Sequence, residues 1–243
     1  MNLIIDLGNT RLKLALFEGD KLLKIHKLDE SELDDFIQEL DLDKVERVIV
    51  SSVIASDSPV EEKLNALGLK LYRVRPLLES YPFKSKYSTP DTLGEDRICN
   101  AIAAAHMFPG KNVLSIDLGT CNKYDMLDAN GVYQGGSISP GFEMRLKAMH
   151  EYTGRLPMLE AERPEEWLGT STEKAMLTGA YFGIIGEINY FIEQYGEKFS
   201  DLRVLLTGGF SLYFEKALKN HIFADPNLTL RGMNELLKSL EDK

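Results

Sequence analysis

The sequence has little of what disulfide-rich, zinc-binding or membrane-spanning proteins contain. Its two cysteines, Cys99 and Cys121, form no Cys-x-x-Cys pair, which excludes a disulfide framework and argues against a structural zinc site. The four histidines show no metal-ligand spacing either. No apolar run approaches the ~20 residues of a membrane-spanning helix, and segment 1–6 reaches a charge too early for a signal peptide. We therefore expect a cytoplasmic protein that does not enter a membrane.

The sequence also contains fewer basic than acidic residues. The chain has 28 Lys and Arg against 38 Asp and Glu, a formal net charge of −10. This balance argues against a nucleic-acid or anionic-membrane binder, which needs a basic face. It leaves room for a small anionic ligand, because backbone N–H groups or a metal ion can hold one locally. The 243 residues, 44% of them hydrophobic, are typical of one large or two small globular domains.

Three familiar nucleotide-binding patterns are missing. The sequence contains no Gly-x-x-x-x-Gly-Lys-[Ser/Thr] and no Gly-x-Gly-x-x-Gly, which argues against P-loop and Rossmann proteins. It also lacks the His-Arg-Asp and Asp-Phe-Gly motifs of protein kinases.

An internal repeat is the most informative feature present. Segment 5–10, Ile-Asp-Leu-Gly-Asn-Thr, returns as Ile-Asp-Leu-Gly-Thr at 116–120. Each copy predicts a strand, a Gly/Thr turn, a second strand, a tight turn and a third strand. These strands are expected at 3–6, 12–17 and 21–28, and again at 113–117, 123–127 and 132–139. The wide separation of the copies indicates a duplicated half of the chain.

Strands and helices alternate after each hairpin unit. We expect further strands at 47–53, 69–74 and 204–207, and helices at 31–40, 60–67, 94–108, 172–195, 211–220 and 233–240. This alternation predicts an α/β fold with an N-terminal lobe, 1–109, and a C-terminal lobe, 110–243. The small residues of helix 172–195 predict close packing; they are Ala175, Gly179, Gly183 and Gly186.

The Asp-x-Gly turns are the first candidate for chemistry. Asp6 ends a predicted buried strand, at the sheet edge where α/β proteins bind ligands. Gly8 permits a tight turn, and Asn9, Thr10 and successive N–H groups could cradle phosphate oxygens. A carboxylate beside phosphate implies Mg²⁺ between them, usually through water. The alternative is a plain hairpin turn with a solvated Asp, which the second copy makes less favoured.

The opening of helix 94–108 is the second candidate. Asp96 and Arg97 lie in its first turn, where the helix dipole stabilises a carboxylate as the anion. Such a weak base suits phosphoryl transfer, which needs an oriented hydroxyl more than an early deprotonated one. The guanidinium of Arg97 matches a carboxylate or phosphate. The alternative is an acidic capping turn with a surface arginine.

Two glycine-rich turns, 135–141 and 206–209, each connect a strand to a helix and could present N–H groups to a nucleotide. Ordinary strand–helix connections also use glycine.

Together these motifs resemble the superfamily of acetate and sugar kinases, 70-kDa heat-shock chaperones and actin. In finer detail the chain is similar to the type III pantothenate kinases across nearly its whole length. The segments that carry this resemblance are 6–10, Tyr87 with 93–97, 117–120, 135–141, 169–172 and 206–209. The resemblance implies two ribonuclease-H-like lobes with a cleft between them, and ATP-dependent phosphorylation of pantothenate to 4′-phosphopantothenate, the first step of coenzyme A biosynthesis.

The resemblance also implies roles for individual residues. Asp96 would be the general base, and Asp117 would bind a monovalent cation, K⁺ or ammonium. The implied pantothenate-binding residues are Tyr87, Gly94, Glu95, Arg97 and Thr172, the last reaching across a homodimer. The implied ATP-binding residues are Asp6, Leu7, Gly8, Asn9, Thr10, Arg11, Leu12, Lys13 and Thr120, with Asp6 also near Mg²⁺.

The sequence departs from the family pattern after Asp117. The family usually continues Gly-Thr-Ala-Thr-Thr, whereas segment 119–123 reads Gly-Thr-Cys-Asn-Lys. We hypothesise that the ammonium of Lys123 partly replaces the monovalent cation. The alternative is that Lys123 points to solvent from an exposed strand.

Two other functional classes deserve comparison with a small-molecule kinase. A non-catalytic regulator of the same fold, binding nucleotide or pantothenate, would not need Asp96 and Arg97, which this chain retains. An actin- or chaperone-like switch would need inserted subdomains or a peptide-binding domain, for which 243 residues leave little room.

Overall fold

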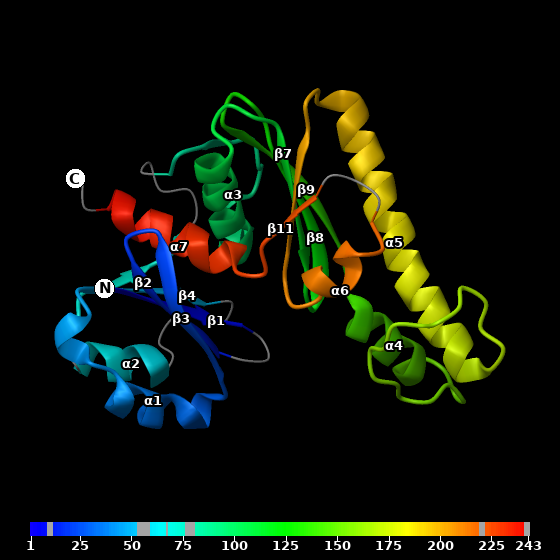
Figure 1. Cartoon of the computed structure of the whole chain (residues 1–243), viewed down its shortest axis with the longest axis horizontal. Helices are drawn as coiled ribbons and strands as arrows, with labels where there is room; N and C mark the ends of the chain where they lie inside the picture. Colours follow the sequence, from blue (N-terminus) through cyan, green and yellow to red (C-terminus); the bar gives the residue numbers. More distant parts are fainter. Residues whose placement is uncertain (9–11, 53–58, 67, 76–80, 219–221, 241–243) are drawn as a thin grey trace. The chain divides into compact units, whose positions relative to one another are not determined.

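The computed structural model groups the chain into two compact units, 1–107 with 228–243, and 108–227. It describes all residues except 9–11, 53–58, 67, 76–80, 219–221 and 241–243 (Figure 1). No helix among the residues described combines the length and apolar character that a membrane crossing requires.

The first unit is built on a sheet with the strand order β3-β2-β1-β4-β5. Its strands are β1 (Asn2–Leu7), β2 (Leu12–Glu18), β3 (Lys21–Leu28), β4 (Arg47–Ser52) and β5 (Leu71–Arg73), and β6 (Lys84–Ser85) follows. Its helices are α1 (Leu33–Glu39), α2 (Pro59–Ala66), α3 (Glu95–Met107) and α7 (Leu228–Ser239). Short 3₁₀ turns cover Glu30–Glu32, Leu42–Lys44 and Pro90–Thr92.

Alternation along β1 determines which residues meet which helices. Leu3, Ile5 and Leu7 belong to one apolar core with residues of α1 and α2. The intervening residues, Ile4 and Asp6, therefore lie on the opposite face of the sheet. Helix α7 contacts β1 and β4, and α3 contacts β4. The two pairs of helices thus cover opposite faces of this sheet (Figure 1).

Helix α7 returns the end of the chain to the first unit, a difference from the expected division at 109/110. It packs against α3 so closely that a Cβ added at Gly232 would lie 1.8 Å from the carbonyl oxygen of Cys99. The side chain of Asn2 donates a buried hydrogen bond of 3.0 Å to Asn234 on α7. These contacts join segments 133 and 232 positions apart, which local sequence patterns do not reveal.

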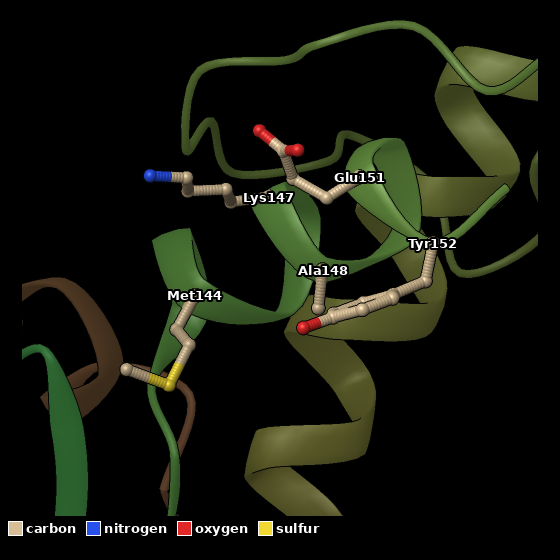
Figure 2. Close-up of a pocket in the computed structure, with 5 residues that line it drawn as sticks. All are labelled: Met144, Lys147, Ala148, Glu151 and Tyr152. Atoms are coloured by element: carbon tan, nitrogen blue, oxygen red, sulfur yellow. The ribbon is translucent and has the colours of Figure 1, made fainter.

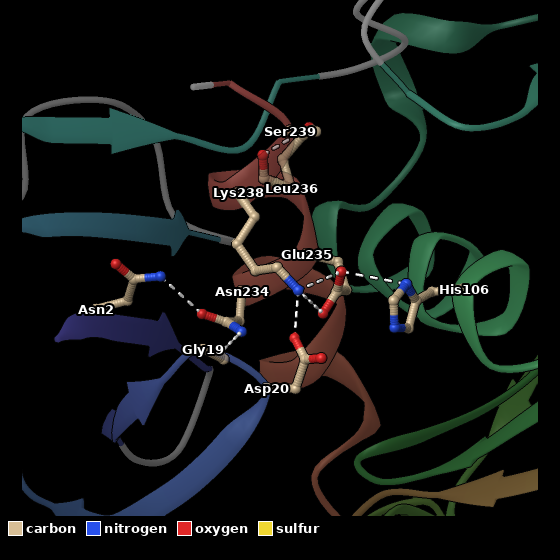
Figure 3. Close-up of polar contacts among 9 residues, drawn as sticks. All are labelled: Asn2, Gly19, Asp20, His106, Asn234, Glu235, Leu236, Lys238 and Ser239. Carbon is tan, nitrogen blue, oxygen red and sulfur yellow. Dashed lines mark hydrogen bonds and ion pairs between the residues drawn. The ribbon is translucent and has the colours of Figure 1, made fainter. Parts of the chain in front are cut away.

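Further polar contacts hold α7 in place (Figure 3). Asn234 donates to the carbonyl oxygen of Gly19, which lies in the β2–β3 turn, at 2.9 Å. Lys238 forms ion pairs with Asp20 and with Glu235, and Glu235 lies 3.2 Å from the Nδ1 atom of His106 on α3. Helix α7 is therefore bound to the β2–β3 hairpin as well as to α3.

The second unit repeats the plan around the strand order β11-β10-β7-β8-β9. Its strands are β7 (Val113–Leu118), β8 (Cys121–Leu127), β9 (Val132–Pro140), β10 (Arg203–Thr207) and β11 (Ile222–Ala224). Its helices are α4 (Phe142–Glu151), α5 (Thr172–Lys198) and α6 (Ser211–Glu215). Leu114, Ile116 and Leu118 pack with these helices, so Asp117 lies on the other face of the sheet. Its β7–β8–β9 hairpins match the expected second copy.

Several predicted elements differ from the observed ones. Helix α7 begins at Leu228 rather than at 233, because the helix-disfavouring Gly232 is accommodated by its close packing against α3. Helix α6 ends at Glu215, well before 220, and β11 was not expected. The expected close packing is wrong at two of the α5 glycines, since a Cβ at Gly179 or Gly186 would meet no atom within 4 Å among the described residues, whereas a Cβ at Gly183 would lie 3.4 Å from Arg145 Nη1.

Candidate functional site

The first Asp-x-Gly turn places Asp6 at the end of β1. Its side chain is 13% exposed, and the Nζ atom of Lys13, its register partner on β2, lies 3.9 Å from Asp6 Oδ2. Ser51 is the register partner of Asp6 on β4, and its buried hydroxyl has no hydrogen-bond partner among the described residues. An acidic and a hydroxyl side chain thus share one face at the end of two neighbouring strands.

The remaining residues predicted for ATP in this turn divide into two groups. The side chains of Leu7 and Leu12 are buried in the apolar core, so these two residues offer a ligand their backbone groups alone. Asn9, Thr10 and Arg11 lie outside the described residues. The structure therefore places Asp6, Gly8 and Lys13 at the turn and does not test the other polar members.

The N-terminus of α3 positions Asp96. The backbone N–H of Arg97 donates to Asp96 Oδ1 at 2.8 Å, so the carboxylate folds back over the first turn. A Cβ at Gly94 would lie 2.6 Å from that same oxygen. Gly94 therefore leaves the space that the Asp96 carboxylate occupies.

Arg97 and Tyr87 form a second, adjacent pair in the first unit. Arg97 is 3% exposed, and its Nη1 donates to the Tyr87 hydroxyl at 3.3 Å. Its guanidinium carbon lies 5.4 Å from the centre of the Tyr87 ring, within cation–π range. The alternative of a surface arginine is therefore wrong, because this guanidinium is held in a fixed, largely desolvated orientation.

Cys99 lies on α3 with its thiol buried. Burial raises the pKa of Cys99 well above its usual range, and the negative charges of Asp6, Glu95 and Asp96 raise it further. Helix α3 contacts β4, the neighbour of β1 in the sheet, and α7 contacts both α3 and β1. The fold thereby places two motifs that are 90 residues apart in sequence in the same unit.

The second Asp-x-Gly turn holds Asp117 at the end of β7. Asp117 is 8% exposed, and its Oδ2 accepts a hydrogen bond of 2.9 Å from the Nζ of Lys123, its register partner on β8. The Lys123 side chain is 18% exposed. The alternative that Lys123 points to solvent is therefore wrong.

Two glycine turns pack against the same loop. Gly208, with φ of +91°, approaches so closely that a Cβ there would lie 2.5 Å from Asp117 Oδ1 and 2.4 Å from the carbonyl oxygen of Leu118. A Cβ at Gly141 would lie 2.1 Å from the carbonyl oxygen of Gly119, and the Gly141 N–H donates to Thr120 O at 3.0 Å. The two glycine-rich motifs singled out in the sequence therefore close around Asp117.

Thr172 is the exposed first residue of α5. The preceding Ser171 caps the helix, its Oγ accepting from the N–H of Lys174 at 3.2 Å. A Cβ at Gly169 would lie 2.4 Å from the Ala175 nitrogen, so the turn before the helix is tightly packed. Thr172 belongs to the second unit, whereas Tyr87 and Arg97 belong to the first.

A polar network around Glu187 of α5 was missed from the sequence. Its carboxylate accepts hydrogen bonds from Tyr124 at 2.7 Å, from Arg145 at 2.5 Å and from Ser139. Burial favours a raised pKa for Glu187, but these hydrogen bonds and the Arg145 charge outweigh it and lower the pKa. No motif signals this network, because its members come from four separate elements.

A pocket on α4 is lined by none of the predicted site residues (Figure 2). Its lining residues are Met144, Lys147, Ala148, Glu151 and Tyr152. Figure 2 shows all five projecting from one helix and the turn after it, with the Tyr152 ring extending toward Ala148. Tyr152 is 88% exposed.

Comparisons with known proteins identify the family to which the chain belongs. The family model described as type III pantothenate kinase matches residues 2–194. A type III pantothenate kinase of Christiangramia forsetii is 41% identical over 242 residues, covering 98% of this chain and 98% of that protein. A second, from Bacteroides fragilis, is 41% identical and covers 98% of this chain and 97% of that protein.

A solved structure shows the same fold at lower identity. A conserved Baf family transcriptional activator of Campylobacter jejuni, described as putative, aligns with a TM-score of 0.64 and 20% identity, covering 99% of this chain and all of that one. This likeness confirms the predicted two-lobed α/β fold and concerns the fold alone. The family match extends over more than half of the chain and the relatives cover nearly all of it, so the chain belongs to the type III pantothenate kinase family.

Proposed function

We propose that this chain transfers the terminal phosphoryl group of ATP to the pantothenate hydroxyl, forming 4′-phosphopantothenate for coenzyme A biosynthesis. Membership of the family supports the reaction, and the 41% identity over nearly the whole chain supports the substrate. The single observation that carries the proposal is the Asp96 carboxylate, which the Arg97 N–H holds at 2.8 Å over Gly94, next to the buried guanidinium of Arg97. A regulator that only binds its ligand would not require that arrangement.

Asp96 is the proposed general base. Its carboxylate is fixed by the Arg97 N–H at 2.8 Å and by the packing of Gly94 beneath it. It accepts the hydrogen bond of the substrate hydroxyl and takes its proton as the bond to phosphorus forms. In a loose transition state the main requirement is that the attacking hydroxyl is correctly oriented, and this anchored carboxylate orients it.

Pantothenate combines a carboxylate with a hydroxyl, and the adjacent residues suit both groups. The buried guanidinium of Arg97 is a planar donor for a carboxylate, and Tyr87 holds it in place through its hydroxyl and ring. Gly94 and Glu95 complete the proposed substrate-binding set on this turn.

The proposed ATP site is centred on the first Asp-x-Gly turn. Backbone groups of Leu7, Gly8 and Leu12 and the ammonium of Lys13 would contact phosphate oxygens, together with Asn9, Thr10, Arg11 and Thr120. The described residues contain no group of three His, Cys, Asp or Glu side chains that could bind a metal ion without a nucleotide. Kinases hold Mg²⁺ through one or two carboxylates together with the phosphates of the nucleotide. Asp6 fits this requirement, through water. The ion neutralises charge on the transferring phosphate when bound.

Asp117 is the proposed site of a monovalent positive charge, which the family resemblance assigns to K⁺ or ammonium. The ion pair with Lys123 bears directly on the identity of that charge.

We also propose a cytoplasmic homodimer in which Thr172 completes the pantothenate site of the other subunit. Large apolar side chains are exposed in the second unit, including Tyr152 at 88% and Trp167 at 73%. Phe182, Gly186 and Tyr190 form an exposed row on α5 at helical spacing, with open space above the glycine. An apolar face of this kind is typical of a subunit interface.

The test is the reaction itself, with purified full-length protein, ATP, Mg²⁺, KCl and pantothenate. Asp96→Asn should lower kcat by about 10²–10⁴-fold, the contribution of a general base. Asp91→Asn, which removes a carboxylate from the exposed 3₁₀ turn nearby, is the matched control and should leave kcat unchanged. Near-normal turnover of the folded Asp96→Asn variant would remove Asp96 from the mechanism. A folded wild-type protein that transfers no phosphate would refute the reaction.

A further inference from the structure

The two copies of the hairpin carry the same cross-strand pair of opposite charges. Asp6 is the register partner of Lys13, and Asp117 is the register partner of Lys123, each one step from the turn. Directly opposed residues of antiparallel strands project from the same face, so a lysine lies opposite the aspartate in both copies. The duplication thus preserves a charge pair and not just a glycine turn.

The second pair is the tighter and more buried of the two. The Nζ–Oδ2 distance is 2.9 Å for Lys123 and Asp117, against 3.9 Å for Lys13 and Asp6. The Lys123 side chain is 18% exposed, whereas that of Lys13 is 36% exposed. Lys123 therefore makes a charge-assisted hydrogen bond in a largely desolvated position, and Lys13 retains access to solvent and to a ligand.

The two oxygens of Asp117 have different neighbours. Oδ2 accepts from Lys123, and Oδ1 lies against the turn at Gly208, where a Cβ would come within 2.5 Å. A K⁺ ion on Oδ2 would lie close to the ammonium, and the two positive charges would repel strongly with little water between them. Hence the residues around Asp117 do not fit a free monovalent cation on Oδ2.

We infer that the ammonium of Lys123 is a permanent substitute for that cation, so that this kinase does not depend on added K⁺ or ammonium. Lys123 acts as a positioning residue, because it neutralises and orients Asp117 without itself entering the reaction. The inference rests on the proposed pantothenate kinase activity, which the same experiment measures separately.

The test compares phosphorylation rates in KCl and in tetramethylammonium chloride at equal ionic strength, with ATP, Mg²⁺ and pantothenate fixed. Tetramethylammonium is too bulky to replace a bound K⁺. Wild-type protein should be equally active in both salts. The Lys123→Thr variant leaves Asp117 without its counter-charge and offers an oxygen ligand to a cation. The phosphorylation rate of this variant should therefore fall about 10²-fold in tetramethylammonium chloride and recover in KCl. Lys123→Arg keeps the charge and should resemble wild type in showing no dependence on K⁺.

Thermal unfolding supplies a readout that does not depend on turnover. A cation that binds the native protein raises its Tm, so KCl should raise the Tm of Lys123→Thr relative to tetramethylammonium chloride and leave that of wild type unchanged. Lys111→Thr is the matched control, because it removes a lysine from an exposed ion pair with Asp201 in the same unit. It should respond to neither salt.

The outcomes separate the two proposals. Loss of wild-type activity in tetramethylammonium, with recovery in KCl, overturns the substitution while leaving the kinase reaction intact. Absence of phosphate transfer by wild type in every salt refutes the kinase reaction instead. If Lys123→Thr does not fold in either salt, the salt series of wild type and Lys123→Arg decides the question.

Discussion

Replacing Gly232 with alanine should destabilise the protein through one identifiable contact. Gly232 lies within α7, where alanine is the better helix former by about 1 kcal/mol. An alanine Cβ would, however, lie 1.8 Å from the Cys99 carbonyl oxygen and 2.5 Å from its carbonyl carbon. Both obstacles are backbone atoms of α3, so no side-chain rotation relieves the clash, and the two helices must separate.

The magnitude follows from these opposing terms. Inserting a methyl group into a tightly packed core costs about 1–3 kcal/mol, and a backbone obstacle places this site at the upper end. The gain in helix propensity offsets about 1 kcal/mol, which leaves a net loss of about 2 kcal/mol in the free energy of unfolding. For a chain of this size each kcal/mol lowers Tm by about 2–4 °C, so we expect a decrease of about 4–8 °C.

Differential scanning calorimetry measures this change, with Gly196→Ala as the matched control. Gly196 is also helical and exposed, and a Cβ there meets no atom within 4 Å among the described residues. Its replacement should leave Tm unchanged or raise it, because helix propensity acts alone. If Gly232→Ala raises Tm as Gly196→Ala does, the close approach of α3 and α7 is refuted.

Two further predictions concern the second unit. Because hydrogen bonds lower the pKa of Glu187, its contribution to stability is present above the unfolded-state pKa and is lost as pH falls through the folded-state value. Glu187→Gln should therefore cost about 1–3 kcal/mol in urea unfolding at pH 7 and progressively less toward pH 3; a cost independent of pH would contradict this account. Trp167→Asp should convert the proposed dimer to monomer in analytical ultracentrifugation, whereas Leu23→Asp, an exposed apolar position of the first unit, should not. A Trp167→Asp variant that stays dimeric would exclude this surface as the interface.

Much of the fold and site could be predicted from local patterns. The repeated Asp-x-Gly turns predicted two related hairpin units, because strand alternation and turn glycines are encoded within a few neighbouring residues. Asp96 and Arg97 could be placed in the first turn of α3 for the same reason. The family resemblance, now confirmed by the comparisons, rested on these motifs and their order along the chain.

Tertiary structure decided what those local patterns left open. The sequence alone determined that Asp117 and Lys123 lie near one turn, but the strand register and the burial of both side chains made them an ion pair. The membership of α7 in the first unit depends on the contact of Gly232 with Cys99, across 133 positions of sequence. Such contacts follow from packing and long-range pairing, which no local periodicity specifies, because their free energy is realised when distant segments meet.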